Sequence, residues 1–415
     1  MDLLELARDV VEGKAALPQT GLMLGVDPGL RELLPGVAFV PSFCNVMPLA
    51  AEGALALVDT GAELVAAMNH AAVRAWTQAP LCLAVYTHGH VDHCMGMAPW
   101  DQEADAAGRA RPRVLAQRGV LARFERYRAT AGYNGAINRR QFSLDALEWP
   151  TSYRAPDEVF DEETRVELGD RALRLRHARG ETDDHAWVVL ERPRVLYPGD
   201  LFIWCSPNAG NPQKVQRYPR EWALALREMI AEQPALMLPS HGLPLAGAEE
   251  IARVLSTTAE ALEFLHDSAL ARMNAGEPLD AILHGVRLPR ALAELPWMQP
   301  IYDEPEFILR NVWRQYGGWW TGDPAALHPA PERALALEVA ELAGGAQALA
   351  SRARALVDAG DDVSLRKAVQ LVRWARLAAP DDAGIREAHG AVFAARVACA
   401  TSLMAKGIYG AAARA

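Results

Sequence analysis

The sequence predicts an α/β fold over residues 1–248, followed by an all-helical region over residues 249–415. From about residue 20 to 245, short β-rich runs such as GVAFV, LCLAVYTHGH and HAWVVLE alternate with helical stretches. After about residue 250, Ala, Leu, Glu and Arg recur at helical spacing. A chain of 415 residues, 51% of them hydrophobic, is long enough to bury the cores of two or three domains.

The composition favours a soluble protein that acts on small molecules. A formal net charge of -10 disfavours a nucleic-acid partner, because phosphate binding needs a concentrated basic surface. The five cysteines include no CxxC pair, which argues against a disulfide framework and against a thiolate zinc site. The N-terminus is acidic where a signal peptide is basic, and prolines interrupt the longest apolar region, residues 33–58. We therefore expect a cytoplasmic protein without membrane association.

Several β-rich runs end directly in polar residues, namely Asp59, His88, His177, Asp200 and His241. In layered α/β folds, reactive side chains collect where strands stop and loops begin. The sequence therefore predicts a functional site at these strand ends.

The run YTHGHVDH leaves one of these strands and holds His88, His90, Asp92 and His93 within six positions. Imidazole and carboxylate groups are the ligands of borderline and hard divalent ions such as zinc. The chain has only 11 histidines, so three at fixed positions beside an aspartate are unlikely to be a chance set of core or surface residues. The run therefore predicts a metal site.

This run resembles the HxHxDH motif of the metallo-β-lactamase superfamily, over a stretch of roughly residues 20 to 245. VDTG (58–61), Gly199-Asp200 and SHG (240–242) resemble further motifs of that fold and follow in its order. The resemblance implies an αββα sandwich with one or two metals at the edge between its sheets. It implies His88 and His90 on a first metal, Asp92, His93 and His241 on a second, and Asp200 between them.

Glu181 marks a departure from most members, which place a histidine at this point of the third motif, HARGETDDH (177–185). A glutamate there is a feature of the alkylsulfatase branch, which AGYNGAINRRQF (131–142), SPNAGNPQKVQRYPREW and YGGWWTGDPAAL also resemble. This implies Glu181 as a ligand of the first metal and two divalent ions, with Zn²⁺ expected. In the alternative, Glu181 is a solvated loop residue and His177 or His185 is the ligand.

The same resemblance extends to the last helices, which look like the dimerisation domain of that branch and imply a homodimer. Residues 362 to about 400 are expected to form a helix pair joined at APDD. Long members of the branch continue into a sterol-carrier-like domain, and this sequence ends at Ala415 without it. Long-chain sulfates are therefore in doubt, and a small organic sulfate or related ester is the expected substrate.

The charge of the expected site also points to a sulfate ester. Asp92, Glu181, Asp200 and one hydroxide would balance two divalent ions, and a nearly neutral site suits a monoanionic sulfate ester better than a dianionic phosphate. We expect hydrolysis by a metal-activated water. The alternatives are another hydrolase of this fold, acting on a thioester, lactone or phosphodiester, and a non-catalytic metal-binding scaffold.

The residues expected at the reacting centre are Asp92, Tyr133, Asn134, Arg139 and Arg217. Further candidates for contact with the sulfate are Asn138, Arg140, Asn208, Asn211 and Lys214. Arginine offers a planar fork to an oxyanion, and asparagine donates hydrogen bonds without adding charge. Each of them could equally be an ordinary loop or helix-cap residue. Asp183, Asp184 and His185 are candidates for orienting the metal ligands.

Overall fold

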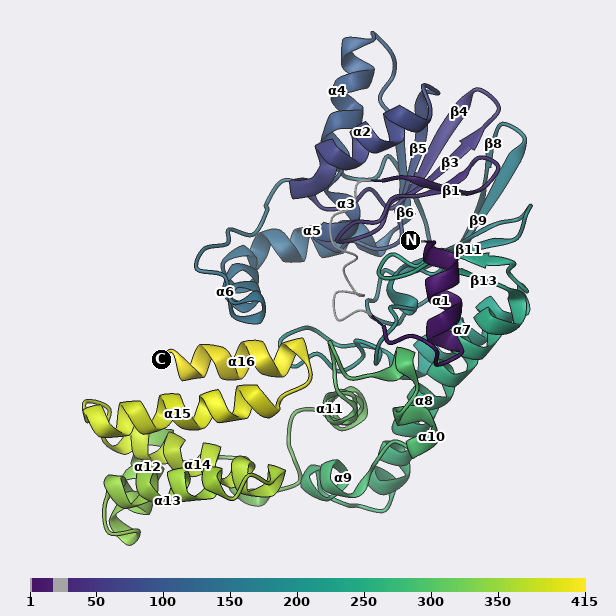
Figure 1. Ribbon diagram of the computed structural model, residues 1–415. Coiled ribbons are helices and arrows are strands. Elements are labelled where there is room, and N and C mark those ends of the chain that lie inside the picture. The colour runs from purple at the N-terminus through teal and green to yellow at the C-terminus, as the bar shows by residue number, and fades with distance from the viewer. Residues whose placement is uncertain (1, 18–28) are drawn as a thin grey trace. The chain divides into compact units, whose positions relative to one another are not determined.

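The computed structural model of the chain describes residues 2–17 and 29–415 (Figure 1). The start of the expected α/β pattern, residues 20–28, lies outside the described residues. The chain divides into two compact units. The sheet unit comprises residues 1–131, 149–275 and 282–316, and the helical unit comprises residues 132–148, 276–281 and 317–415. The expected domain boundary at residues 248/249 falls at the start of α8 (Ala248–Asn274), which this division keeps with the sheets.

The first sheet of the sheet unit has seven strands in the order β1 to β7. Strands β1 to β4 pair in antiparallel fashion, and β4 to β7 pair in parallel. The strands are β1 (Arg31–Leu34), β2 (Val37–Phe39), β3 (Met47–Ala51), β4 (Ala54–Val58), β5 (Leu81–Tyr86), β6 (Arg113–Gln117) and β7 (Glu158–Phe160).

The second sheet has six strands in the order β13-β12-β11-β10-β9-β8. Its pairs are antiparallel except for β11 and β12, which are parallel. The strands are β8 (Glu163–Leu168), β9 (Arg171–His177), β10 (Ala186–Leu190), β11 (Val195–Tyr197), β12 (Leu236–Met237) and β13 (Leu245–Ala246).

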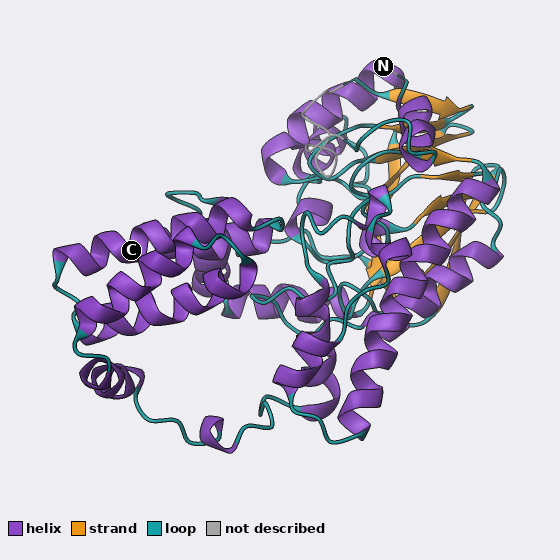
Figure 2. Ribbon diagram, turned by 60° about the horizontal axis from the view of Figure 1, so that its bottom comes forward, coloured by secondary structure: helices purple, strands orange, loops and turns teal. Residues whose placement is uncertain are grey.

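The alternation of side chains along each strand builds the layers. In β5, Leu83 and Val85 point into a core that Leu175 and Val188 of the second sheet share. Tyr86 points to the opposite face, where α2 (Ala66–Trp76), α4 (Ala98–Ala106) and α5 (Gly119–Ala129) cover the first sheet. On the other side, α7 (Pro219–Ala231) packs on α8, and α8 contacts β12 and β13. Figure 2 shows helices on both sides of the strands, which confirms the expected αββα sandwich.

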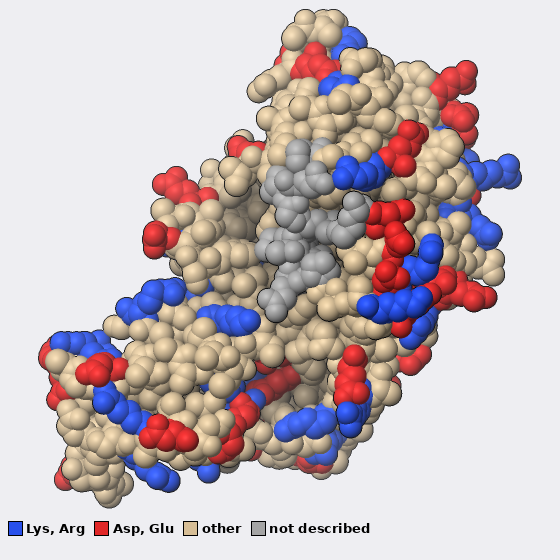
Figure 3. Space-filling view, in the orientation of Figure 1, with Lys and Arg blue, Asp and Glu red and all other residues tan. Residues whose placement is uncertain are grey.

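Short helices and the segments after β13 complete the sheet unit. They are α1 (Leu3–Val11), η1 (Glu63–Val65), α3 (Val91–Cys94), η2 (Gly199–Leu201), α10 (Arg290–Ala293), η3 (Pro296–Met298) and α11 (Pro305–Gly317). Helix α9 (Leu279–Gly285) has residues in both units. Of the described helices, none combines the length and the apolar character that crossing a membrane requires. Acidic and basic side chains are interspersed over the face shown in Figure 3.

The helical unit has its own core, formed by residues such as Leu349, Val372, Ile385 and Val392. Its helices are α6 (Ala131–Phe142), α12 (Glu332–Leu342), α13 (Ala346–Asp358), α14 (Asp362–Ala378), α15 (Ala383–Cys399) and α16 (Leu403–Ala413), with the 3-10 turn η4 (Pro324–Ala326) directly before α12. The expected joint at APDD is confirmed, because α14 ends there and the side chain of Asp382 caps α15 through the N–H of Ile385.

Helix α6 carries several of the residues expected at the reacting centre, and it packs within the helical unit. A Cβ at Gly407 of α16 would lie 2.7 Å from the carbonyl oxygens of Arg140 and Gln141. Only glycine allows two backbones to approach this closely. The segment 132–148 is therefore a part of the helical unit, although it precedes the whole second sheet in the sequence.

Candidate metal centre

The candidate site lies where strands of both sheets end. The histidine run follows β5, and α3, which contains Asp92 and His93, begins directly after His90. Glu181 lies in the loop between β9 and β10, Asp200 in η2 after β11, and His241 in the loop after β12. The fold thus brings together residues from four separate parts of the sequence.

His88, His90, Glu181 and Asp200 form a first group, whose ligand atoms all lie within 4.8 Å of one another. Nε2 of His88 lies 2.8 Å from Nδ1 of His90. Oε2 of Glu181 lies 3.5 Å from the first of these nitrogens and 3.3 Å from the second. His177 is in neither group, since its Nε2 lies 2.9 Å from the carbonyl oxygen of Asp183.

Asp92, His93 and His241 form a second group around Oδ1 of Asp200. Oδ1 of Asp200 lies 3.4 Å from Nε2 of His93 and 3.4 Å from Nε2 of His241. Oδ2 of Asp92 lies 3.4 Å from Nε2 of His241 and 3.7 Å from Nε2 of His93. Oδ2 of Asp200 lies 3.8 Å from Nε2 of His88 in the first group. Asp200 therefore stands between the two groups.

The donor atoms of both groups fit divalent cations. Oε2 of Glu181, Nε2 of His93 and Oδ1 of Asp200 are buried and have no hydrogen-bond partner among the described residues. Buried polar atoms are normally paired, so unpaired ligand atoms in both groups indicate that each group can bind a cation. Nitrogen and carboxylate oxygen are the donors that zinc takes.

Burial and nearby charges favour the ligand forms of His88, Glu181 and Asp92. Burial, followed by the nearby His93 and His90, lowers the pKa of His88 to about 3, which keeps its imidazole neutral. Burial by itself would raise the pKa of Glu181, but Arg217 and His90 outweigh it and lower the pKa well below its usual value. Burial likewise opposes His93 and His241 at Asp92, and these two imidazoles prevail and lower its pKa. Burial by itself would lower the pKa of His93 and His241, but Asp200 and other groups outweigh it and raise both.

Cys44 is a neighbour of the second group that the sequence did not suggest. Its Sγ lies 3.4 Å from Nδ1 of His93, whereas Asp92 and Asp200 approach Nε2 of that ring. Burial raises the pKa of the Cys44 thiol, and only the thiolate is a good metal ligand. Cys44 is therefore a weaker candidate ligand than the two carboxylates.

Asp59, directly after β4, organises the second group. It accepts hydrogen bonds from the backbone N–H of Thr87 at 2.8 Å, from the Thr87 hydroxyl at 2.9 Å and from the Ser240 hydroxyl at 2.6 Å. It also lies 2.8 Å from Nδ1 of His93. The sequence places Asp59 among the strand-end residues of the predicted site and assigns it no specific role there.

Asp184 and His185 support the first group in ways that the sequence did not predict in detail. Oδ2 of Asp184 accepts a hydrogen bond from the backbone of Gly89 at 3.1 Å and one from the buried Arg123 at 2.7 Å. Nε2 of His185 accepts a hydrogen bond from the backbone N–H of Asp200 at 3.1 Å. Asp184 thus anchors the backbone between His88 and His90. The expectation was that it would orient an imidazole directly, and it accepts hydrogen bonds from Gly89 and Arg123 instead.

The loop after η2 brings two of the expected substrate-contacting residues into contact with Glu181 and also carries Lys214. Asn208 donates a hydrogen bond to Oε1 of Glu181, and Arg217 donates one to the Glu181 carbonyl oxygen. Nζ of Lys214 lies 5.7 Å from the ring centre of Trp149. Burial, followed by the charge of Arg217, lowers the pKa of Lys214 to about 8.

Tyr133, Asn134 and Arg139 lie on α6 in the helical unit. Tyr133 is exposed, and Arg139 donates a hydrogen bond to the carbonyl oxygen of Leu147 at 2.9 Å. Asn138 donates one to the carbonyl oxygen of Asn134 at 2.8 Å. Their role at the reacting centre stays a prediction.

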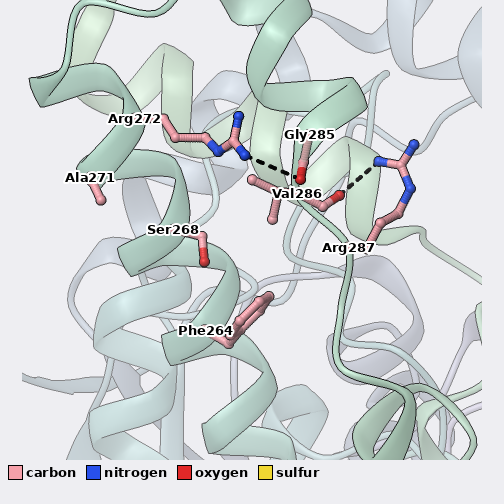
Figure 4. A pocket seen from close by; sticks show the side chains of 7 residues that line it. All are labelled: Phe264, Ser268, Ala271, Arg272, Gly285, Val286 and Arg287. Carbon is pink, nitrogen blue, oxygen red and sulfur yellow. Dashed lines mark hydrogen bonds between the residues drawn. The ribbon is translucent and has the colours of Figure 1, made fainter.

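A pocket of about 430 Å³ lies elsewhere in the sheet unit, between α8 and the segment 285–287 (Figure 4). Its two arginines bind main-chain carbonyls. Arg272 donates to Gly285 at 3.3 Å, and Arg287 donates to Val286 at 2.8 Å. None of the residues that line this pocket belongs to either metal group.

Two family models match the chain. The model of the metallo-beta-lactamase superfamily matches residues 40–241, and that of alkyl sulfatase dimerisation matches residues 279–415. A linear primary-alkylsulfatase from Pseudomonas sp. (strain ATCC 19151) is 27% identical over 74% of this chain and 61% of its own length. An (R)-specific secondary-alkylsulfatase from Pseudomonas sp. is 26% identical over 83% of this chain and 56% of its own length. The chain thus spans about six tenths of the length of these relatives.

Among solved structures, the stereoselective inverting sec-alkylsulfatase Pisa1 from Pseudomonas sp. is similar to this chain, with a TM-score of 0.80 and 24% identity. The match covers 92% of this chain and 64% of that one. At this identity the likeness establishes the fold, and it includes the helical region as well as the sandwich.

Proposed function

Residues 40–241 of this chain belong to the metallo-β-lactamase superfamily and residues 279–415 to the alkyl sulfatase dimerisation family, and on this premise we propose that the protein hydrolyses organic sulfate monoesters. The observation that carries the proposal is the position of Glu181 beside His88 and His90, because it adds a third carboxylate to the site. The similarity to proteins described as alkylsulfatases supports it.

The ligand sets of two divalent ions, best suited to zinc, are part of the proposal. His88, His90 and Glu181 would hold one ion, Asp92, His93 and His241 the other, and Asp200 would bridge them. When bound, such ions act as Lewis acids that lower the pKa of a water molecule to about 7 and stabilise negative charge on oxygen.

The side chains of the site set its charge and its geometry. Asp92, Glu181 and Asp200 contribute three negative charges, which leave two divalent ions and one hydroxide nearly neutral. A sulfate monoester carries one negative charge, so such a site should repel it little and should hold a dianionic phosphate less well than a positive site would. Asp59 and Asp184 keep His93 and the His88–His90 backbone in place.

Lys214 is the proposed cation for the sulfate group. Among the described residues, the Nζ of Lys214 has no hydrogen-bond or ion-pair partner and lies only near the ring of Trp149. Arg217, in contrast, is paired with Glu181. A sulfate oxygen would supply the missing acceptor. The residues of α6, with Tyr133, Asn134 and Arg139, are proposed as further contacts, and the last helices are proposed to form a homodimer.

The test is a substrate panel with the purified, zinc-loaded protein. We expect kcat/KM for short alkyl and aryl sulfates to exceed that for the matching phosphate monoesters, thioesters and lactones. A His88→Ala variant should abolish this activity, whereas His177→Ala, in neither group, should keep it. Faster turnover of the phosphate monoester would contradict the charge argument, and faster turnover of a thioester or lactone would point to another hydrolase of this fold.

A further inference from the structure

The loop of residues 208–217 contacts Glu181 through Asn208 and Arg217. It also packs against a segment that lies outside the residues matched by the metallo-β-lactamase model. This segment, residues 303–314, includes most of α11 and falls inside the match to alkyl sulfatase dimerisation. In the structure it belongs to the sheet unit. Two buried side chains, Asp303 and Asn311, make the connection.

Asp303 holds the first half of the loop. Its Oδ2 accepts hydrogen bonds from the backbone N–H groups of Gly210 at 2.6 Å and Asn211 at 3.0 Å. The side chain of Asn211 in turn donates to Oδ1 of Asn208 at 3.3 Å, and Asn208 donates to Oε1 of Glu181. A continuous chain of hydrogen bonds therefore runs from Asp303 to the carboxylate of Glu181.

The contact at Gly210 is too close for any other residue. A Cβ at this position would lie 2.2 Å from the backbone carbon of Phe307 and 2.3 Å from the nitrogen of Ile308. Backbone atoms of a helix cannot give way as a flexible side chain can, so the loop is seated directly on the start of α11. This packing fixes the distance between α11 and the loop.

Asn311 holds the second half of the loop by both atoms of its amide. Its Oδ1 accepts a hydrogen bond from the N–H of Arg217 at 3.3 Å, and its Nδ2 donates to the carbonyl oxygen of Arg217 at 2.9 Å. Arg217 then donates to the carbonyl oxygen of Glu181, and its guanidinium lies 3.5 Å from Oε1. Arg217 therefore holds the backbone of Glu181 and places a positive charge beside its carboxylate.

We propose that Asp303 and Asn311 are positioning residues of the candidate metal site, which hold Glu181 through Asn208 and Arg217. The inference rests on the metal site of the proposed function. Oε1 of Glu181 is engaged by the loop, and this leaves Oε2 to face His88 and His90. Outer partners of this kind set the orientation of a ligand and typically change metal affinity by about 10–100-fold.

A consequence is that the region matched by the metallo-β-lactamase model does not complete its own metal site. The two residues that fix Glu181 from behind lie more than 60 positions beyond residue 241, as the numbers 303 and 311 show. The helix that carries Asn311 is shared between the sheet unit and the region named for dimerisation. We therefore expect that a change which removes α11 also weakens metal binding at Glu181.

The test measures zinc affinity in the full chain by competition with a chromophoric chelator. Asp303→Asn puts an N–H₂ group against backbone N–H donors, and Asn311→Leu removes both bonds to Arg217. Each should weaken the site that contains Glu181 by roughly ten-fold. The matched control is Arg310→Gln, on the same helix. Arg310 is half exposed and forms its ion pair with Glu306, not with Asn208 or Arg217. Its zinc affinity should equal that of the parent protein.

Double-mutant cycles separate positioning from a general loss of stability. If Asp303 acts through Asn208, Asp303→Asn should have little further effect in an Asn208→Ala background, while Asn311→Leu keeps its effect there. The effect of Asn311→Leu should vanish in an Arg217→Met background. If Asp303→Asn does not fold, the second cycle alone decides.

Undiminished effects in these backgrounds, or zinc affinities equal to that of Arg310→Gln, would overturn the inference. Because zinc affinity is measured without substrate, the two proposals fail separately. Non-additive cycles in a protein that hydrolyses no sulfate ester would refute only the proposed function. Additive cycles in an active sulfatase would refute only the positioning role.

Discussion

The carboxylate of Asp59 lies 2.8 Å from Nδ1 of His93. Burial by itself would raise the pKa of Asp59, but His93 outweighs it and lowers the pKa, so the carboxylate is ionised and can only accept hydrogen bonds. Nδ1 of His93 therefore carries the proton that it donates to Asp59, and Nε2, which faces Asp92 and Asp200, is the nitrogen that would bind a metal after losing its own proton.

Asp59→Asn should weaken zinc binding at the second group by about 10–100-fold. The asparagine can turn its N–H₂ group towards Nδ1 and so favour the tautomer in which Nε2 carries the proton. Chelator competition measures the affinity, and thermal unfolding of the zinc-free protein serves as the control for folding. Unchanged zinc affinity in the folded variant would show that Asp59 serves the fold alone.

Glu181→Gln should lose metal at the first group and most of the hydrolytic activity, because glutamine replaces the charged ligand that lies beside the neutral imidazoles of His88 and His90. The loss of affinity should exceed the roughly 10–100-fold that outer partners contribute. Elemental analysis after dialysis gives the occupancy, and His177→Ala is the matched control. Full occupancy and activity in Glu181→Gln would return His177 to the set of candidate ligands.

Lys214 should make the binding of a sulfate ester depend on pH. Its pKa of about 8 means that its charge is present at pH 7 and is lost as the pH rises through 8. We expect KM for a sulfate ester to rise above pH 8 by up to about ten-fold, the effect of losing a hydrogen bond to a charged group. In Lys214→Arg the rise should be absent, since arginine stays charged. An identical pH profile in both proteins would remove Lys214 from the sulfate site.

Asp303 should make the stability of the fold depend on pH. Burial raises its pKa to about 7, against the opposing effect of its backbone hydrogen bonds. Between about pH 4 and 7 the native state therefore binds a proton that the unfolded state has released, and the free energy of unfolding falls as the pH rises. The free energy by which the parent is more stable to unfolding than Asp303→Asn should shrink as the pH rises from about 4 to 7, by at most about 1.4 kcal/mol per pH unit. Urea denaturation at several pH values measures it, and a difference independent of pH would be inconsistent with the raised pKa.

Arg123→Met should destabilise the fold by about 3–5 kcal/mol, because it leaves the buried carboxylate of Asp184 without its cation. Both oxygens of Asp184 lie 2.7 Å from nitrogens of Arg123. Arg126→Met is the control, since Arg126 is partly exposed and lies 3.9 Å from Asp183, and it should cost less than about 1 kcal/mol. Equal losses in the two variants, measured by urea denaturation, would refute the special role of the Arg123–Asp184 pair.

Local patterns in the sequence were sufficient for the α/β region and the helical region, and the resemblance to a known motif implied the sandwich. Alternation of apolar residues in strands such as β5, and cap residues such as Asp382, act within a few positions, so the sequence displays them directly. The run from His88 to His93 is equally local, and its resemblance to a known motif drew Glu181, Asp200 and His241 into one candidate site. The structure brings these side chains together, and their role as ligands stays a prediction.

What the tertiary structure decided are contacts between residues far apart in the chain. Asp59 with His93 and Ser240, Asp184 with Gly89, and Asn311 with Arg217 each join segments that no local periodicity connects. The placement of α6 in the helical unit is of the same kind, because it depends on the fit of a helix against Gly407. The sequence by itself determined which chemical groups end the strands near Glu181. The packing of α11 decided how Glu181 is held, because a carboxylate is oriented by donors that only the folded chain places around it.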